Sequence, residues 1–282
     1  MLWLVGALFG VLILYLFLTA PNLRNAKTRC EAIPKAPYAH RGLHDGSVPE
    51  NSLTAFRRAA EKGYGIELDV HLTKDGHLAV MHDGSLKRMC GSDQRIPLLT
   101  LREVQSFRLL DTGERVPAFA DVLKAVAPRK TPLIVEMKSD PENWRALPEK
   151  LLAAMQGYPG FWCVESFDPR MLGWFRRNAP QVVRGQLAYD PRRIGEKRPL
   201  YYVFGADLLT NFLSRPDFIS YQHEADGNLS FRAVRRLFRP CAAAWTVQSQ
   251  KDFDDLRKRY DLQIFEGFEP PVIANKEKEK QP

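Results

Sequence analysis

The chain has 282 residues, and its 41 Lys and Arg outnumber its 33 Asp and Glu to give a formal charge of +8 at neutral pH. Hydrophobic residues form 45% of the chain and charged residues 26%, a balance that excludes a disordered, collagen-like or disulfide-scaffold protein. The basic residues are scattered and do not alternate with aromatic residues as they do in single-strand binders, so we expect no nucleic-acid partner.

The amino-terminal segment is an unbroken apolar run from Leu2 to Leu18. A helix of about 17 to 20 residues, at about 1.5 Å per residue, reaches most of the way across a hydrocarbon core of about 30 Å. We therefore predict a transmembrane anchor over residues 1–22, followed by a linker over residues 23–36.

A cleaved signal peptide is the alternative interpretation of this run. No basic residue precedes it, and Pro21 follows the small residues at its end, which is a poor context for cleavage. Arg24, Lys27 and Arg29 come just after the run, and positive charge beside a span favours the cytoplasmic side. We therefore expect a single-pass membrane protein whose body is cytoplasmic.

The four cysteines are widely spaced, and none belongs to a Cys-x-x-Cys pair or lies near a histidine at zinc-ligand spacing. We expect no structural metal cluster, and we expect free thiols, which agrees with a reducing compartment. These residues are Cys30, Cys90, Cys163 and Cys241.

From Pro34 to about Ala274 the sequence alternates short apolar runs with amphipathic stretches, which is the pattern of βα units in a parallel sheet. Residues 203–208 and residues 217–220 are alternative positions for one of these strands. Strands are expected at 38–40, 65–71, 78–82, 133–138, 161–166, 183–188, 217–220, 242–246 and 262–265.

The helices between these strands carry recognisable ends. Asn51 or Ser52 can cap the first of them, and Gly63 can end it. Helices are expected at 53–62, 119–126, 143–155, 169–178, 229–238 and 251–259.

About eight βα units in roughly 240 residues predict an α/β fold, a TIM-type (β/α)8 barrel, over residues 37–274. Residues 83–115 form a long insertion, and such insertions act as functional lids or are passive. Residues 275–282 are expected to be a charged, solvated tail.

Active sites of such barrels lie at the carboxyl ends of the strands, and polar residues of this chain gather there. Glu67 and Asp69 are two residues apart on one expected strand, so their side chains share a face. The other candidates at strand ends are His40, Arg41, His82, Glu136 and Lys138.

These residue types together point to metal-assisted cleavage of a phosphodiester. The carboxylates of Glu67, Asp69 and Glu136 offer hard oxygen ligands that suit Mg²⁺ or Ca²⁺ better than zinc. Arg41 and Lys138 are placed to hold phosphate oxygens. The two histidines, His40 and His82, can supply a general base and a general acid near pH 7.

Seven stretches carry a resemblance to a known family. They are AHRG at 39–42, PENSLTAF at 49–56, GIELDVHLTKDGHLAVMHD at 65–83, TGERVPAFADVL at 112–123, PLIVEMK at 132–138, ESFDP at 165–169 and AAWTV at 243–247. In this order, and over about residues 38–273, they resemble the glycerophosphodiester phosphodiesterase family.

The resemblance implies a TIM-type barrel that hydrolyses glycerophosphodiesters to glycerol 3-phosphate and an alcohol with a divalent cation. It implies His40 and His82 as the acid–base pair, Glu67, Asp69 and Glu136 as metal ligands, Arg41 and Lys138 as phosphate contacts, and Phe167 and Trp245 as aromatic residues lining the glycerol side.

The sequence departs from the family pattern in two places. Gln248 stands where the family usually has Asn, and the last strand lacks the usual Asp, for which Glu266 or Glu269 is the candidate replacement. Of the other histidines, His71 is the one that could face the mouth of the barrel, because it follows Asp69 with a period of two.

Several alternatives stay open at this point. Another barrel phospholipase, directed at phosphatidylinositol or sphingomyelin, has similar chemistry, and a non-enzymatic relic could bind phospholipid head groups. A sugar-phosphate isomerase-type barrel would need a glycine-rich phosphate loop that the sequence does not show. A site held at a membrane could take lysophospholipids as well as soluble glycerophosphodiesters, and the sequence sets no oligomeric state.

Overall fold

The structure, a computed structural model, describes residues 2–140, 143–193, 195 and 199–272. The predicted tail at 275–282 lies outside the described residues, as do the last two residues of the predicted barrel domain.

Eight parallel strands close into a barrel, which confirms the predicted fold class. β1 pairs with β2 on one side and with β9 on the other, so the sheet has no free edge among these strands. The strands are β1 (Tyr38–His40), β2 (Gly65–Leu72), β4 (Leu133–Met137), β5 (Trp162–Ser166), β6 (Val183–Ala188), β7 (Phe218–Gln222), β8 (Cys241–Val247) and β9 (Leu262–Phe265).

The inner face of the barrel changes from apolar to acidic along the strands. Side chains from seven strands form an apolar cluster that fills the amino-terminal half of the interior. Ile134 of β4 belongs to this cluster, and Glu136, two residues further on, shares its face. On the neighbouring strand, Cys163 and Glu165 repeat this pair in register. The apolar side chains close the amino-terminal end of the barrel to water, and the polar side chains lie at the carboxyl ends of the strands.

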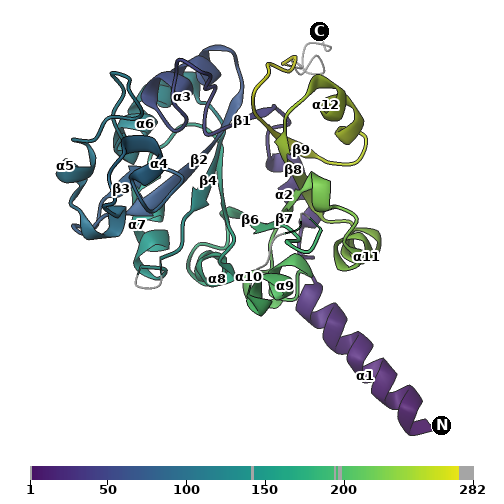
Figure 1. The fold of residues 1–282 in the computed structure, drawn as a ribbon. Helices are drawn as coiled ribbons and strands as arrows, with labels where there is room; N and C mark the ends of the chain where they lie inside the picture. Colours follow the sequence, from purple (N-terminus) through teal and green to yellow (C-terminus); the bar gives the residue numbers. More distant parts are fainter. Residues whose placement is uncertain (1, 141–142, 194, 196–198, 273–282) are drawn as a thin grey trace.

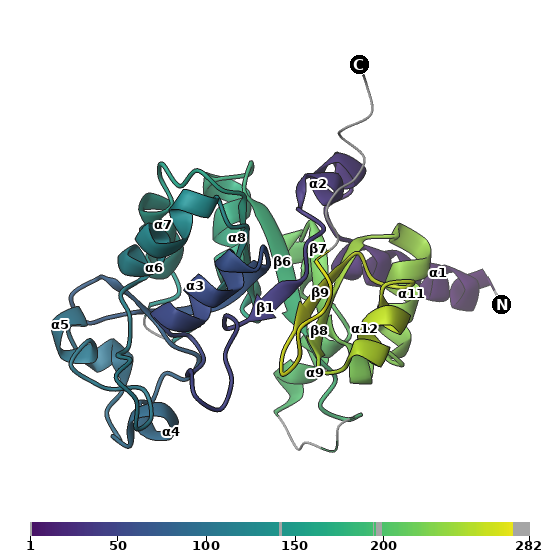
Figure 2. The same ribbon diagram turned by 90° about the horizontal axis from the view of Figure 1, so that it is seen from above.

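Helices surround the barrel and bury their apolar faces against the outward side of the strands (Figures 1 and 2). Ser52 caps the first of them by accepting the Ala55 N–H at 3.1 Å. Six lie at or close to the predicted positions: α3 (Leu53–Glu61), α6 (Phe119–Val126), α7 (Ala146–Ala154), α8 (Pro169–Asn178), α11 (Leu229–Phe238) and α12 (Gln250–Leu256).

Two predicted strands do not belong to the barrel. β3 (Leu78–Val80) runs antiparallel to the end of β2, because β2 extends beyond the barrel rim and folds back as a hairpin. The competing run at 203–208 is wrong as a strand, since it contributes to α9 (Leu200–Ala206), and α10 (Asn211–Ser214) follows before β7.

The insertion is an ordered subdomain beside the mouth. It contains α4 (Lys87–Cys90), a 3-10 turn (Ile96–Leu98) and α5 (Leu101–Val104). Its buried side chains, among them Met89 and Leu109, form a small hydrophobic cluster with Ala79 of β3 and Met81.

The amino-terminal helix α1 (Leu2–Thr19) leaves the barrel as a long exposed rod (Figure 1). Its mean hydropathy is 2.4 and only 6% of it is buried, so its length and composition suffice to cross a membrane, a test that a signal sequence also passes. Its last turn is docked on the barrel wall: the Tyr15 hydroxyl lies 2.8 Å from Ser230 Oγ, and Asn211 donates to the Thr19 carbonyl at 2.9 Å.

The predicted linker is folded under the barrel. It contains α2 (Ala26–Ala32), and Ile33 after it is fully buried in the interior cluster. Arg29 donates to both carboxylate oxygens of the buried Asp217, at 2.6 and 2.8 Å, which holds α2 against the amino end of β7.

The prediction of four free thiols is wrong for two of them. Cys30 of α2 is joined to Cys241 of β8 by a disulfide, with a Cα–Cα distance of 5.6 Å, whereas Cys90 and Cys163 are free. The sequence gives no sign of this pair because 211 residues separate its members, and only the return of α2 beneath the barrel brings them together. The thiol argument for a reducing compartment is therefore lost.

We expect replacement of Cys30 by serine to lower the free energy of unfolding by about 2–5 kcal/mol, because a cross-link over a long loop restricts the unfolded chain. Thermal unfolding of the full chain in detergent measures this, with Cys90→Ala as the control at a free cysteine. Alkylation of four thiols in the unreduced wild-type chain would contradict the pairing.

Candidate active site

Three buried carboxylates gather at the carboxyl ends of β2 and β4. Asp69 lies opposite Glu136 in the strand register, and Glu67 precedes Asp69 on the same face. One oxygen from each of the three lies within 4.8 Å of the others. The structure thus brings the predicted acidic trio together.

Two cations contact this trio. Lys138 Nζ lies 2.9 Å from Asp69 Oδ1 and 2.7 Å from Glu136 Oε1. The Arg41 backbone N–H donates to Glu67 Oε2 at 3.0 Å, and its guanidinium Nε is 3.5 Å from Asp69 Oδ2. Arg41 adopts a left-handed backbone conformation, with φ of 54°, that turns this N–H inward.

Burial and the neighbouring charges shift the pKa values of all three carboxyl groups. Burial and the charges of Asp69 and Glu165 raise the pKa of Glu67 well above its usual range. Burial also raises the pKa of Glu136, to about 7, although Lys138 opposes this. Burial acts the same way on Asp69, but Lys138 and other cations outweigh it and hold the pKa of Asp69 well below its usual range. The cluster therefore has more acid than its resident cations neutralise.

His40, the first predicted catalytic histidine, ends β1 and is held by a carboxylate. Its Nδ1 lies 2.6 Å from Glu266 Oε2, and its Nε2 is 3.9 Å from Glu67 Oε2. Burial lowers the pKa of His40 although Glu266 opposes this, and the His40 hydrogen bond lowers the pKa of Glu266 to about 2. Of the two candidate acids in the last segment, Glu266 therefore reaches the site, whereas Glu269 pairs with Lys62 on the surface.

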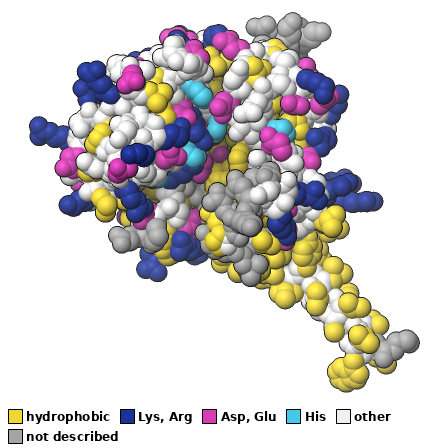
Figure 3. Space-filling view, in the orientation of Figure 1, with side chains coloured by type: hydrophobic (Ala, Val, Ile, Leu, Met, Phe, Trp, Pro, Cys, Tyr) yellow, Lys and Arg dark blue, Asp and Glu magenta, His cyan; other side chains and the backbone are white. Residues whose placement is uncertain are grey.

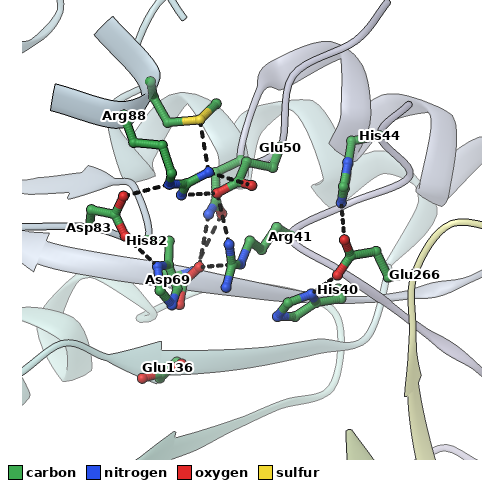
Figure 4. A network of polar contacts seen from close by, with 12 residues as sticks. His40, Arg41, His44, Glu50, Asp69, His82, Asp83, Arg88, Glu136 and Glu266 are labelled. Carbon is green, nitrogen blue, oxygen red and sulfur yellow. Dashed lines mark hydrogen bonds and ion pairs between the residues drawn. The ribbon is translucent and has the colours of Figure 1, made fainter. Parts of the chain in front are cut away.

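His82, the second predicted catalytic histidine, is also held by a carboxylate (Figure 4). Its Nδ1 lies 2.7 Å from Asp83 Oδ1. Burial and the Lys138 charge lower its pKa. His82 follows β3, which is no barrel strand, yet the hairpin returns the chain so that Met81 N–H donates to the Asp69 carbonyl. Each imidazole thus has its Nδ1 engaged by a carboxylate, which favours the tautomer with a free Nε2.

Sequence reasoning assigned no role to Arg88. This residue of α4 donates to Asp83 at 2.7 Å and to Glu50 at 2.6 and 3.0 Å, and Glu50 in turn accepts from Arg41 at 2.9 Å. Arg88 therefore joins the carboxylate that holds His82 to the carboxylate that holds Arg41 (Figure 4). No local pattern signals this role, because the insertion has to fold before Arg88 reaches the mouth.

We expect Arg88→Ala to lower kcat/KM about tenfold through displacement of His82 and Arg41. Arg88→Lys should not restore activity, since one ammonium cannot reproduce the planar fork that bridges two carboxylates. Steady-state kinetics on a glycerophosphodiester measure both, and Arg95→Ala in the same insertion is the matched control. Equal kinetics of Arg88→Ala and Arg95→Ala would refute the positioning role.

Two further residues, Asn51 and Glu165, lie beside the trio. Asn51, which the sequence offered as a possible helix cap, donates to Asp69 Oδ2 at 2.8 Å, and Ser52 is the residue that caps the helix. Glu165 lies next to Glu136 in register, and burial and the Glu136 charge raise its pKa to about 8. His71 is buried and contacts the His82 carbonyl at 3.2 Å, so it supports the hairpin.

Aromatic side chains line one side of the mouth. Phe167 and Trp245 lie edge to face with ring centroids 5.8 Å apart, which places both predicted residues together. The row continues from Phe167 to Tyr189 at 5.8 Å, and from Tyr189 to Tyr202 of α9 at 6.1 Å. Gln248, which replaces the usual Asn, is exposed.

The acidic trio fits a divalent cation. All of its donor atoms are hard oxygens, and they converge within the distance that one ion can bridge. Zinc prefers nitrogen and sulfur ligands, which are absent from this described cluster.

A closed barrel whose mouth carries a buried cluster of acids, two carboxylate-held histidines and two basic side chains is typical of one class, the barrel phosphodiesterases. Residues 40–259 match the model of the glycerophosphoryl diester phosphodiesterase family. The chain belongs to this family.

Curated relatives agree with this assignment. A glycerophosphodiester phosphodiesterase of Caldanaerobacter subterraneus is 38% identical over 53% of this chain and 65% of its own length. Human glycerophosphodiester phosphodiesterase 1 is 36% identical over 71% of this chain and 64% of its own length. The matched part thus spans slightly less than two thirds of these relatives.

Solved structures share the fold. An Oleispira antarctica phosphodiesterase in complex with the product sn-glycerol-3-phosphate superposes with a TM-score of 0.69, at 17% identity, over 84% of this chain and 94% of its own. A Thermotoga maritima glycerophosphodiester phosphodiesterase does so with a TM-score of 0.64, at 24% identity, over 82% and 93%.

Proposed function

We propose that this protein hydrolyses glycerophosphodiesters to glycerol 3-phosphate and an alcohol. The observation that carries the proposal is the pair of imidazoles, each fixed by a carboxylate, beside a buried trio of acids with Arg41 and Lys138. Family membership favours this reaction over the phosphatidylinositol and sphingomyelin alternatives. The Oleispira relative holds sn-glycerol-3-phosphate as its product, which is the product proposed here.

We assign cation binding and phosphate binding to different residues of the mouth. Glu67, Asp69 and Glu136 would hold the cation, either Mg²⁺ or Ca²⁺, which when bound supplies positive charge for the phosphate oxygens. Arg41 and Lys138 bind phosphate oxygens and stabilise the charge that develops on them.

Proton transfer falls to the two histidines. With Nδ1 engaged by Glu266 or Asp83, the free Nε2 of one imidazole takes a proton from the nucleophile, and that of the other gives a proton to the leaving alcohol. The nucleophile is water or the neighbouring glycerol hydroxyl. Both imidazoles have lowered pKa values, so the base is neutral and able to accept a proton at pH 7 in the free site. The general acid has to take up a proton at Nε2, as an imidazolium, before it can give one to the leaving alcohol.

Lysophospholipids are the second candidate substrate. The row of aromatic rings from Trp245 through Phe167 and Tyr189 to Tyr202 provides an apolar surface that leads from the mouth to α9. An acyl chain on the glycerol could lie along it. We propose α1 as a retained membrane anchor. The charges after it favour a cytoplasmic body, whereas the Cys30–Cys241 disulfide favours the oxidising side of the membrane.

The test is a substrate panel. We would incubate the full chain in detergent with glycerophosphodiesters and lysophospholipids, with Mg²⁺ or Ca²⁺, and assay glycerol 3-phosphate and lysophosphatidate. Release of glycerol 3-phosphate is expected, and Trp245→Ala should weaken binding of the lysolipid more than that of the soluble diester. Cleavage of neither class would refute the proposal.

A further inference from the structure

The exposed face of α11 carries positive charge that no acid balances. Leu229, Arg232 and Arg236 recur at helical spacing on this face, and Arg239 follows at its end. None of these three arginines forms an ion pair with a described residue. The sequences of α9, α10 and α11 contain no Asp or Glu.

Exposed apolar side chains lie on α9, α10 and α11, and the last turn of α1 contacts α10 and α11. Phe204 of α9 is 46% exposed, Leu213 of α10 is 37% exposed and Leu229 of α11 is 79% exposed. Figure 3 shows apolar side chains continuing from α1 onto the barrel beside it, with basic groups next to them. Large apolar groups rimmed by arginines are typical of a surface that lies at a lipid interface.

Hydrogen bonds and ring contacts attach the last turn of α1 to this wall. Tyr15 contacts Ser230 on α11, and Arg215 after α10 donates to the carbonyls of Phe17 and Ala20. The Phe17 ring lies 6.1 Å from that of Phe212. When α1 crosses a bilayer, these contacts bring α9, α10 and α11 to the membrane surface.

We propose that the face formed by α9, α10 and α11, here called the collar, docks on the anionic headgroup surface of the bilayer that α1 spans. Phe204, Leu213 and Leu229 enter the interface, and Arg232, Arg236 and Arg239 contact lipid phosphates. The docked collar holds the aromatic side of the mouth close to the membrane. The inference rests on the proposed anchor and leaves the proposed chemistry independent of it.

The test is arginine footprinting of the full chain in lipid nanodiscs. Discs of neutral phosphatidylcholine and discs that also contain phosphatidylglycerol would be treated with phenylglyoxal, and modification rates would be read by mass spectrometry. We expect modification of Arg232, Arg236 and Arg239 to slow about fivefold or more in the anionic discs, and to recover in high salt. Arg102 and Arg108, exposed on the insertion far from α1, are the internal controls (Figure 1).

A matched pair of variants separates docking from chemistry. R232Q/R236Q/R239Q should remove the effect of anionic lipid on the rate at which a membrane-embedded lysophospholipid is cleaved, and R102Q/R108Q should not. Neither should change hydrolysis of a soluble glycerophosphodiester, so that assay decides the proposed function separately.

Four outcomes would overturn the collar. The collar arginines could react equally in both disc types, or the controls could slow as much as they do. Protection in neutral discs that rises with protein concentration would show contact with a second copy of the chain instead. Failure of the full chain to co-purify with nanodiscs would remove the anchor and the docking surface with it.

Discussion

Replacement of His40 or His82 by alanine is expected to lower kcat on a glycerophosphodiester by about 10²-fold or more without loss of the fold, because each change removes one of the two proton-transfer groups. Both imidazoles are held at the mouth through Nδ1, at 2.6 Å from Glu266 and 2.7 Å from Asp83. Steady-state kinetics and circular dichroism of the purified variants measure the two effects.

A change of leaving group identifies which histidine is the general acid. A nitrophenyl ester leaves without help from an acid, so its cleavage should recover in the variant that lacks the acid and stay slow in the variant that lacks the base. His77→Ala, at the exposed turn of the β2–β3 hairpin, is the control. Near-normal activity of either His40→Ala or His82→Ala would refute the assignment.

Removal of divalent cations with EDTA is expected to abolish hydrolysis, and Mg²⁺ or Ca²⁺ should restore it. The phosphate charge that the cation offsets is worth several kcal/mol in the transition state, which corresponds to about 10²-fold or more in rate. Glu67→Gln should raise the cation concentration that gives half-maximal activity by tenfold or more, since it removes one of three ligands.

The control for this titration is Glu269→Gln, a surface carboxylate that pairs with Lys62 away from the site. Isothermal titration of the two variants with each cation gives a second readout that does not depend on turnover. Full activity in excess EDTA would show that the trio of carboxylates serves Lys138 and Arg41 alone.

The central contacts of the site were predictable because they depend on local period and on one rule of topology. Glu67 and Asp69 share a face because a strand repeats every two residues, and Glu136 meets them because the ends of parallel strands lie at one rim. Lys138 and Arg41 follow from the same rule.

His82 was placed correctly although the strand before it was assigned to the barrel in error. A short apolar run looks the same in a barrel strand and in a hairpin, so the sequence could not show that β3 runs antiparallel to β2. The hairpin still brings His82 close to Asp69, because the turn at Lys74–Gly76 reverses the direction of the chain.

By itself, the sequence determined the alternation of strands and helices, the closed barrel, the apolar α1 and the acids, cations and histidines of the mouth, since each depends on residues close together in the chain or on its family pattern. Only the tertiary structure decided that Cys30 pairs with Cys241, that Glu266 and not Glu269 holds His40, and that Arg88 links Asp83 to Glu50. These contacts join segments far apart in sequence, and their geometry exists only after the linker, the insertion and the last strand have packed on the barrel.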